Sequence, residues 1–386
     1  MANGYFIERK GCLMRKTLYK IRRWCKGEAV LVAAALGALV TAFFVPPSMA
    51  YWDYIDLKVL CLLFSLMAVV AGWRECGVFE VMAQRLLSGR KNVRVLQLLL
   101  VMLPFFLSML ITNDVALITF VPFTLLILQM ANEADRILPV VILQAVAANL
   151  GSMATPVGNP QNLFLCGTFD LTAADFFATL LPFTLVSLAV LALASLWGKM
   201  GYVQVTFKQR ATIASPRLFV ALVGLFVLCL LAVFRVVHYG VVTAVVVGVI
   251  AFMRPALFRK VDVSLLATFV FFFIFAGNMG EIPALREFLA GLMSESALLT
   301  SAVASQFISN VPAAVLLAGF TQDWQGLLLG VDLGGLGTPI ASLASLIALR
   351  YYFNCPGAQR GKFLLWFTVV NFVGLAGLLL LVPIFI

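Results

Sequence analysis

Long, nearly uncharged apolar runs alternate with short polar or basic stretches along this chain. Most runs approach the roughly 20 residues that a helix needs to cross the hydrocarbon core of a bilayer. Uninterrupted apolar runs of this kind predict membrane-spanning helices rather than amphipathic surface elements. The pattern therefore predicts an all-α polytopic membrane protein. The runs cover residues 29–46, 57–73, 175–197, 217–234, 240–253, 264–278 and 363–386.

Two longer apolar segments are interrupted by polar residues and predict re-entrant helical hairpins. A single helix through residues 95–130 would measure about 54 Å at ~1.5 Å per residue, which exceeds a core of about 30 Å. Thr112-Asn113-Asp114 interrupts this segment and is the predicted tip of the first hairpin. Residues 297–321 predict a second hairpin with Ser309-Asn310-Val311-Pro312 at its tip.

Two further segments predict helices that break within the membrane. Residues 137–168 contain a break beginning near Gly151, and residues 325–350 contain one at Asp332–Thr338. Glycine permits backbone conformations that other residues avoid, and proline lacks the N–H that a helix uses. Irregular backbone at membrane depth survives only where it is buried in protein or lines a cavity. The breaks and the hairpin tips together therefore predict the transport site.

Charge placement sets the predicted orientation. The net charge is +10, but only 11% of residues are charged, against about 25% in soluble domains. Eight basic residues lie in the first 28 positions and others in short loops, as in cytoplasmic loops that orient membrane helices. This placement argues against nucleic acid as a partner, and the bilayer is the expected one. The loop 198–217 is basic and falls inside only if residues 95–130 return to the side from which they enter.

We expect about 11 transmembrane helices plus the two re-entrant hairpins. We expect an inner (plasma) membrane location with a cytoplasmic N-terminus and an external C-terminus. The predicted organisation is a basic segment (1–28), a first helix and outer loop (29–56), repeat 1 (57–198), a cytoplasmic linker (199–216), linking helices (217–263) and repeat 2 (264–386).

The two halves share short motifs in the same order. Ser108-Met109-Leu110-Ile111-Thr112-Asn113 matches Ser305-Gln306-Phe307-Ile308-Ser309-Asn310. The eight residues from Asn149 to Pro156 match those from Asp332 to Pro339. Because the first hairpin enters from inside and the second from outside, the matches predict an inverted-topology repeat. Such repeats place the binding site of many secondary transporters between discontinuous helices.

Candidate binding residues lie in these four polar segments. Amides offer donors and acceptors, hydroxyls add further ligands, and freed backbone groups at helix ends bind small ions. The predicted substrate- or ion-binding residues are Thr112, Asn113, Asp114, Asn149, Gly151, Ser152, Thr155, Pro156, Gly158, Asn159, Asn162, Ser309, Asn310, Pro312, Asp332, Gly334, Gly335, Gly337 and Thr338. For the glycines and prolines, a purely structural kink is an equal alternative.

Two of these candidates are acids, which are functional hypotheses by default at membrane depth. Asp114 is the predicted cation ligand, with Na⁺ held by Asn113, Asp114 and Asn310; its alternative is the N-cap of the returning helix. Asp332 has as its alternative a water-facing position at a shallow break. No Lys or Arg lies within 95–130, 137–198 or 297–349, so an anion would depend on helix N-termini and co-bound cations.

Enzymatic chemistry has no support in this sequence. The chain has one His, and its seven Cys are scattered without metal-ligand spacing. We therefore expect neither a catalytic centre nor a cofactor other than a coupling ion, Na⁺ or H⁺.

Residues 111–116 with 151–162, and 308–312 with 334–338, resemble the ion transporter superfamily, and the resemblance covers roughly 57–386. This superfamily includes divalent anion/sodium symporters, citrate/metal symporters and arsenite-efflux permeases, and the overall appearance is closest to uncharacterised permeases of the group. The resemblance implies an elevator-type transporter and a homodimer. In the symporter branch, Ser-Asn-Thr triplets at both tips bind sodium and carboxylate. Here the third residue departs at both tips, since Asp114 and Val311 replace Thr.

The predicted function is secondary active transport of a small inorganic or organic anion, di- or tricarboxylate-like, by symport with Na⁺ or H⁺. Asn113, Asn310, Thr155 and Thr338 are expected to be ligands, and Asp114 to take the coupling cation or proton. Arsenite or antimonite efflux and Na⁺/H⁺ antiport are the alternatives, which the missing intramembrane base favours. A channel is a further rival, but no helix carries a continuous polar stripe.

Overall fold

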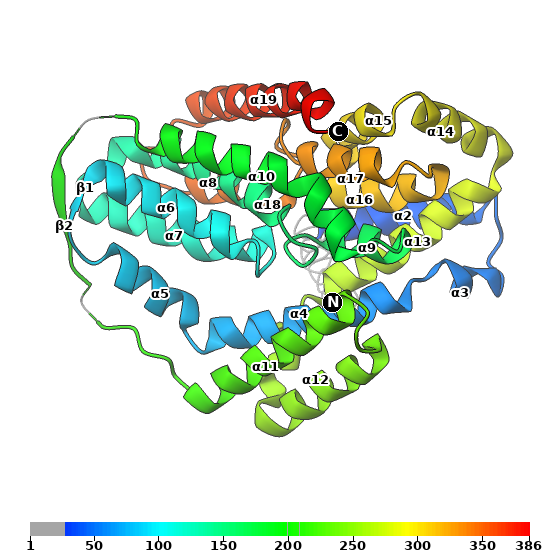
Figure 1. The fold of residues 1–386 in the computed structure, drawn as a ribbon, viewed down its shortest axis with the longest axis horizontal. Coiled ribbons are helices and arrows are strands. Elements are labelled where there is room, and N and C mark those ends of the chain that lie inside the picture. Colours follow the sequence, from blue (N-terminus) through cyan, green and yellow to red (C-terminus); the bar gives the residue numbers. More distant parts are fainter. Residues whose placement is uncertain (1–27, 199, 208) are drawn as a thin grey trace, which may run out of the picture. The chain divides into compact units, whose positions relative to one another are not determined.

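The computed structural model describes residues 28–198, 200–207 and 209–386 (Figure 1). Most of the predicted basic N-terminal segment lies outside the described residues, and so do Lys199 and Lys208 of the predicted cytoplasmic linker. The described part of the chain is mostly helical, as its apolar runs predict.

Seven described helices are long and apolar enough to cross a membrane, so the chain is a multi-pass membrane protein. They are Leu57–Glu75, Asn113–Met130, Ala134–Ser152, Ala173–Ser195, Pro216–Val233, Val263–Glu281 and Arg360–Phe385. Asn113–Met130 and Ala134–Ser152 belong to the predicted first hairpin and broken helix, and the other five overlap predicted single spans. The predicted runs 29–46 and 240–253 form shorter apolar helices.

The smaller of two compact units comprises Asp262–Leu285 and the described part of Met1–Asp56. It contains α2 (Ala29–Ala42), α3 (Ala50–Tyr54) and α13 (Val263–Glu281). The buried Asn278 side chain of α13 donates hydrogen bonds to the hydroxyls of Thr41 (3.1 Å) and Tyr51 (2.9 Å). These bonds satisfy an amide that would otherwise be costly to bury, and they tie the segments together.

The larger unit holds all of the predicted site. Its first half contains α4 (Leu57–Glu75), α5 (Val78–Leu87), β1 (Gly89–Asn92), α6 (Val93–Leu107), α7 (Asn113–Met130), η1 (Ala134–Arg136), α8 (Ile137–Ser152), α9 (Pro160–Thr168), α10 (Ala173–Ser195), β2 (Tyr202–Val205), α11 (Pro216–Val233), α12 (Tyr239–Met253) and η2 (Pro255–Lys260). After α14 (Pro283–Glu295), which begins in the smaller unit, follow α15 (Ala297–Ile308), α16 (Asn310–Leu317), η3 (Ala318–Phe320), α17 (Trp324–Leu333), α18 (Leu343–Phe353) and α19 (Arg360–Phe385).

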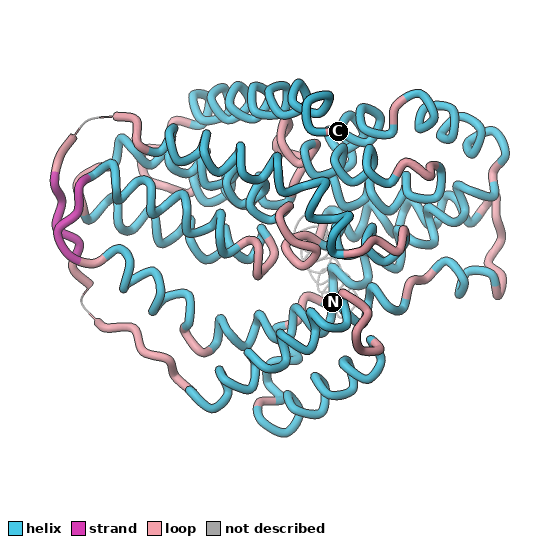
Figure 2. The backbone as a smooth tube through the Cα atoms, in the orientation of Figure 1, coloured by secondary structure: helices cyan, strands magenta, loops and turns pink. Residues whose placement is uncertain are grey.

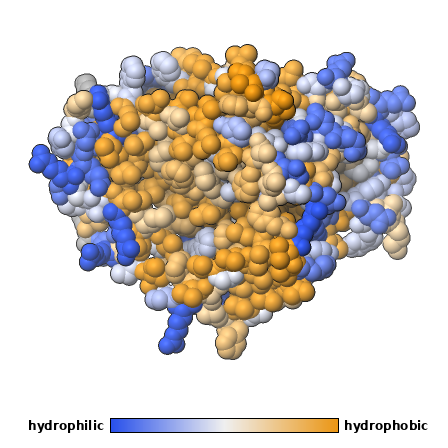
Figure 3. Space-filling view, viewed as in Figure 1, coloured by the Kyte–Doolittle hydropathy of each residue, from blue (hydrophilic) through white to orange (hydrophobic). Residues whose placement is uncertain are grey.

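Three groups of helices pack within this unit (Figure 1). α8 lies against α6, α7 and α10; α17 lies against α15 and α16; and α4 lies against α11 and α12. Hydrophobic side chains cover much of the visible face, over α10 in the middle and over α11 and α12 at the lower edge (Figures 1 and 3). Apolar residues on the outside of a helix group are expected where hydrocarbon rather than water is the solvent.

The helices end where polar segments were predicted to interrupt them. α6 and α7 are separated by residues 108–112, and α15 and α16 by Ser309 alone. α8 and α9 are separated by residues 153–159, and α17 and α18 by residues 334–342. These loop segments lie near one another in the middle of the larger unit (Figure 2).

Two features differ from the sequence-based expectation. β1 and β2 form a two-stranded antiparallel sheet, with Gly89 opposite Val205 and Asn92 opposite Tyr202, so the fold is not purely α. The strand at Gly89–Asn92 is short and polar, and its partner is more than a hundred residues away, so no local period reveals it. The first apolar helix also ends at Ala42, short of the predicted residue 46.

Candidate functional site

The first hairpin tip is fixed against the first helix break. The backbone N–H of Asn113 donates to the carbonyl of Gly158 (3.3 Å), and the Asn113 side-chain oxygen accepts from the N–H of Asp114 (2.8 Å). The Thr155 hydroxyl donates to the carbonyl of Met109 (2.5 Å). The tip and the break are therefore one hydrogen-bonded body.

The second tip and break repeat this arrangement atom for atom. The N–H of Asn310 donates to the carbonyl of Ala341 (2.9 Å), and its side-chain oxygen accepts from the N–H of Val311 (3.0 Å). The Thr338 hydroxyl donates to the carbonyl of Gln306 (2.9 Å). Each accepting carbonyl stands three residues after the break threonine, and each threonine contacts the residue four positions before the tip asparagine.

Asn149 joins the two halves. Its side-chain oxygen accepts from the Asn113 amide (3.0 Å) and from the Ser342 hydroxyl (2.8 Å). Its amide nitrogen donates to the carbonyl of Gly335 and to the Ser345 hydroxyl, at 3.3 Å each. Residues from α7 and α8 are thereby linked directly to the second break and to α18.

This network brings together the first residues of four helices. The N–H of Asn113, the first residue of α7, donates to the carbonyl of Gly158, which lies just before α9. The side chain of Asn113 also donates to Asn149, which in turn accepts from Ser342, the N-cap of α18. The carbonyl before that serine accepts from the first residue of α16. The N-terminus of a helix carries partial positive charge and unsatisfied N–H groups, so four of them in one network favour an anion.

The predicted site residues are removed from solvent to different degrees. Buried are Asn113, Asn149, Gly151, Ser152, Pro156, Gly158, Asn159, Asn162, Asn310, Pro312, Asp332, Gly334, Gly335 and Gly337. Partly exposed are Thr112, Asp114, Thr155, Ser309 and Thr338. The partly exposed residues lie at or beside the tips and include the tip hydroxyls.

Close backbone approach explains two of the glycines. A Cβ at Gly151 would overlap the carbonyl of Phe105 on the first hairpin. Gly337 has a φ of +110°, and a Cβ there would overlap the side-chain oxygen of Gln306. Both positions therefore require glycine for packing, whatever role their backbone has in binding.

The alternatives considered for the two acids are both wrong. Thr112, not Asp114, occupies the N-cap of α7, and Asp114 lies in the first turn. Asp332 does not face water: it is 2% exposed, and its Oδ1 accepts from the Gln161 amide (3.1 Å). The sequence thus named both acids as site candidates, and for Asp332 the structure rules out the water-facing alternative.

Two glutamines contribute more than their sequence context indicated. The Gln306 amide nitrogen donates to the carbonyls of Gly334 (2.9 Å) and Leu336 (3.0 Å), and its oxygen accepts from the N–H of Thr338 (2.8 Å). Gln306 therefore holds the second break in shape, while Gln161 holds Asp332. Gln306 lies in the motif 305–310 and Gln161 in the motif 151–162. A polar side chain within an apolar helix was the sequence feature that could have identified them.

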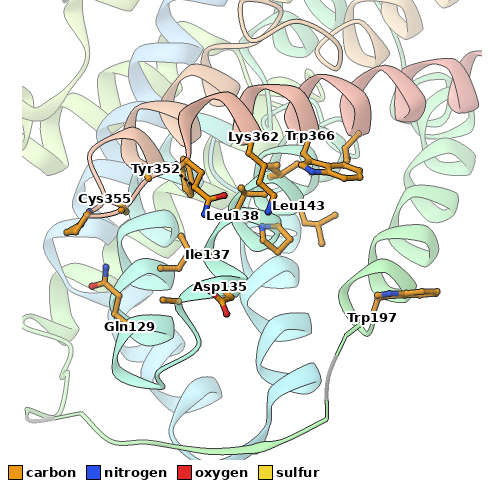
Figure 4. Close-up of a pocket in the computed structure, with 18 of the residues that line it drawn as sticks. Gln129, Asp135, Ile137, Leu138, Leu143, Trp197, Tyr352, Cys355, Lys362 and Trp366 are labelled. Atoms are coloured by element: carbon orange, nitrogen blue, oxygen red, sulfur yellow. Dashed lines mark hydrogen bonds between the residues drawn. The ribbon is translucent and has the colours of Figure 1, made fainter.

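A cavity lies away from this network. It measures about 920 Å³ and is lined by the C-terminal end of α7, the N-terminal end of α8 and residues around the α18–α19 loop (Figure 4). Asn113 and Asn149 occupy the opposite ends of those same helices. Because α7 has 18 residues, the two places are separated by about 25 Å along the helix axis. Burial raises the pKa of the Cys355 thiol in the cavity wall.

No group of three or more His, Cys, Asp or Glu side chains is placed to hold a metal ion in the part of the chain that the structure describes. Any cation bound at the network would therefore depend on amide, hydroxyl and backbone oxygens with at most one or two carboxylates. Those are the ligands that hard cations such as Na⁺ prefer.

Residues 24–325 match the family model described as citrate transporter. The chain belongs to this family. It is 30% identical to an uncharacterized transporter of Methanocaldococcus jannaschii over 337 residues, covering 87% of this chain and 92% of the relative. It is 31% identical to the inner membrane protein YbiR of Escherichia coli, covering 85% of this chain and 89% of that protein.

A more partial match is the silicon efflux transporter of Oryza sativa, 32% identical over 158 residues that cover 41% of this chain and 32% of the relative. The predicted resemblance to the ion transporter superfamily is thus confirmed, and the chain is a transporter-family membrane protein.

Proposed function

We propose that this citrate transporter family member is a secondary active transporter that moves a small anion, di- or tricarboxylate-like, by symport with Na⁺ or H⁺. The observation that carries the proposal is the hydrogen-bonded convergence of four helix N-termini around Asn149. No Lys, Arg or His lies in 95–130, 137–198 or 297–349, so helix ends and a co-bound cation supply the positive charge.

In this mechanism, Asn113 and Asn310 are the tip ligands. The side-chain nitrogen of Asn113 bonds to Asn149, and the backbone N–H of Asn310 bonds to the carbonyl of Ala341. The side-chain oxygen of each asparagine accepts from the next N–H and so fixes the first turn of its own helix. Thr155 and Thr338 hold the tips and present their hydroxyls from partly exposed positions. Asp114, partly exposed in the first turn of α7, takes the coupling cation or its proton.

The paired hydrogen bonds of the two tips support an inverted-topology repeat with two re-entrant hairpins. A repeat of this kind gives a site that alternately faces the two sides of the membrane. We further propose an elevator-type motion, a homodimer, and an inner-membrane location like that stated in the name of the Escherichia coli relative.

Uptake into proteoliposomes tests the function. Radiolabelled citrate and succinate are offered outside, with an inward Na⁺ gradient, an inward proton gradient or neither. We expect uptake that needs one of the gradients and is lost in Asn113→Ala and Asn310→Ala. Absence of gradient-driven uptake for every carboxylate would contradict symport.

Arsenite or antimonite efflux, or Na⁺/H⁺ antiport, is the second candidate. The lack of an intramembrane base favours it, because a neutral hydroxide or a cation needs none, and the rice relative is named an efflux transporter. Arsenite resistance of expressing cells, together with failed carboxylate uptake, would favour this candidate. Asp114→Asn is expected to abolish ion dependence in either case, and unchanged ion dependence would remove the role given to Asp114.

A further inference from the structure

Three buried side-chain oxygens close to one another lack hydrogen-bond partners in the described structure. They are Oδ2 of Asp332 and the carbonyl oxygens of Asn159 and Asn162. Their residues are 2%, 3% and 0% exposed. Buried oxygens without a partner are expensive, and three of them in one place call for a positively charged or donating group.

The three oxygens come from two neighbouring elements. Asn159 is the N-cap of α9, Asn162 lies in its first turn, and Asp332 lies in the last turn of α17, which packs on α9. The side-chain amides of Asn159, Gln161 and Asn162 all lie against the Asp332 carboxyl group. Gln161 already donates to Oδ1, so it orients the carboxyl group, while Oδ2 has no hydrogen-bond partner in the described structure.

No basic side chain faces this carboxyl group from the elements around it. α8, α9, α15 and α16 contain no Asp, Glu, Lys, Arg or His. On α10 and α19 the charged residues stand only in the first turn. Cys166 of α9 is the titratable group that faces Asp332. The basic residues Arg235 and, on α4, Lys58 act on Cys166, and Arg235 pairs with Asp170. An unpaired carboxylate at this depth is too costly to persist without a cation.

The number and kind of oxygens decide which cation fits. A proton on Oδ2 can serve one of the two amide oxygens and leaves the other without a partner. A divalent ion usually draws on more than one carboxylate. We propose that Asp332, Asn159 and Asn162 form a Na⁺ site, with Gln161 positioning the carboxyl group. This site is separate from the cation position proposed at Asn113, Asp114 and Asn310.

The site has a consequence for coupling. Asp332 and Asn149 occupy matching positions in the two halves, and Asn149 bonds to the break that follows Asp332. An ion at Asp332 therefore stabilises the conformation of the break that carries Gly335. The role of this ion as a coupling ion rests on the proposed function. Binding of the ion to the site does not depend on that function.

Equilibrium binding of ²²Na⁺ to the purified protein in detergent, without substrate or gradient, tests the site. We compare the wild type with Asp332→Asn, with Asn159→Ala/Asn162→Ala, and with Asn371→Ala as the control, because Asn371 is equally buried but donates only within α19. Asp332→Asn is expected to bind a single Na⁺ fewer per chain. The double alanine variant is expected to keep that ion with affinity reduced about tenfold or more, and Asn371→Ala is expected to keep it at wild-type affinity.

The neutral amide of Asp332→Asn removes a buried charge, so this variant is expected to remain monodisperse without Na⁺. If it does not, the double alanine variant carries the test, because it retains the carboxyl group. Equal Na⁺ binding by the wild type and both variants, or no Na⁺ binding by the wild type, would overturn the site. If the wild type bound no Na⁺ and only took up a proton as the pH was lowered, the carboxyl group would be assigned to a proton instead. Because no transport is measured, failure of the proposed function leaves these outcomes unaffected.

Discussion

A single buried amide, Asn149, carries most of the polar connection between the two halves. The sequence placed it in the site because an Asn-Leu-Gly-Ser run interrupts an apolar segment. It did not indicate the partners of Asn149, because Ser342 and Ser345 are nearly two hundred residues away. Motifs report which residues are polar at membrane depth, whereas the pairing depends on tertiary packing.

Asn149→Ala tests this central role. The substitution leaves the Asn113 amide and the Ser342 hydroxyl without their acceptor, which costs about 1–3 kcal/mol for each buried group left unpaired. We expect a lower thermal midpoint in detergent and at least about tenfold slower transport, since ~1.4 kcal/mol corresponds to tenfold. Asn371→Ala is the matched control, because Asn371 is equally buried but donates only to Phe367 within α19. Equal transport loss in both variants would contradict a specific role.

The two hairpin tips differ in backbone strain. Ser309 has φ +72° and ψ 155°, a region that non-glycine residues rarely adopt, whereas Thr112 at the corresponding position is extended with φ −63°. Such conformations cost about 1–3 kcal/mol and persist where the surroundings fix them. The sequence matched these residues as equivalent hydroxyls, and side-chain identity alone contained no sign of this difference.

Exchanging the tip residues for glycine and alanine measures the strain. Ser309→Gly is expected to be more stable than Ser309→Ala by about 1 kcal/mol or more, because glycine relieves the strain and both lose the hydroxyl. At Thr112 the order is expected to reverse, because glycine gains only unfolded-state entropy there. The check is thermal unfolding of the four variants in one detergent. The same order at both tips would contradict a strained Ser309.

At the scale of elements, the lengths of apolar runs predicted the helices well. The helices flanking the predicted hairpin tips and breaks end within a few residues of the predicted interruptions, because glycine, proline and polar residues mark them. Gly337 shows the limit of such prediction. Its glycine announces a break, but the reason that only glycine fits is the Gln306 side chain beside it.

Gly337→Ala tests how rigidly the second break is held. The added methyl would meet the Gln306 side chain, and the φ of +110° is unfavourable for alanine, so stability is expected to fall by about 1–3 kcal/mol. Gly377→Ala is the control, because this helical glycine in α19 has open space around it and alanine favours a helix by roughly 1 kcal/mol. Thermal unfolding is measured for both, and a neutral Gly337→Ala would show that the break can readjust.

At the scale of the molecule, the charges at the helix ends give the orientation its physical basis. Glu75 at the end of α4 pairs with Arg254 (2.6 Å) and Lys260 (2.9 Å), so these segments lie together and are expected on the same side of the membrane. Lys91 and its neighbour Arg90 lie on β1, whose partner β2 belongs to the predicted cytoplasmic linker. Since Lys and Arg concentrate in cytoplasmic loops, all these segments are expected inside.

Counting crossings from that side predicts a C-terminus outside. In the predicted topology, α4 arrives inside, the first hairpin returns there, and the broken helix α8–α9 leaves. α10 comes back, α11 leaves and α12 returns to Arg254. α13 then leaves, the second hairpin returns to the outside, α17–α18 come in, and α19 leaves. If either hairpin crossed completely, every later loop would change side, so the C-terminus reports on the hairpins as well as on the helices.

Reporter fusions check this count. Alkaline phosphatase joined after Ile386 is expected to be active and green fluorescent protein there dark, because only the former folds outside the inner membrane. Fusions after Arg254 are expected to show the opposite pattern, which controls for expression and insertion. If the fusions after Arg254 and after Ile386 were both fluorescent, both ends of the segment between them would lie inside. The number of crossings between Arg254 and Ile386 would then differ by an odd number from the predicted count. The second hairpin would then be the first segment to reconsider, because α16 has only eight residues and η3 follows it directly.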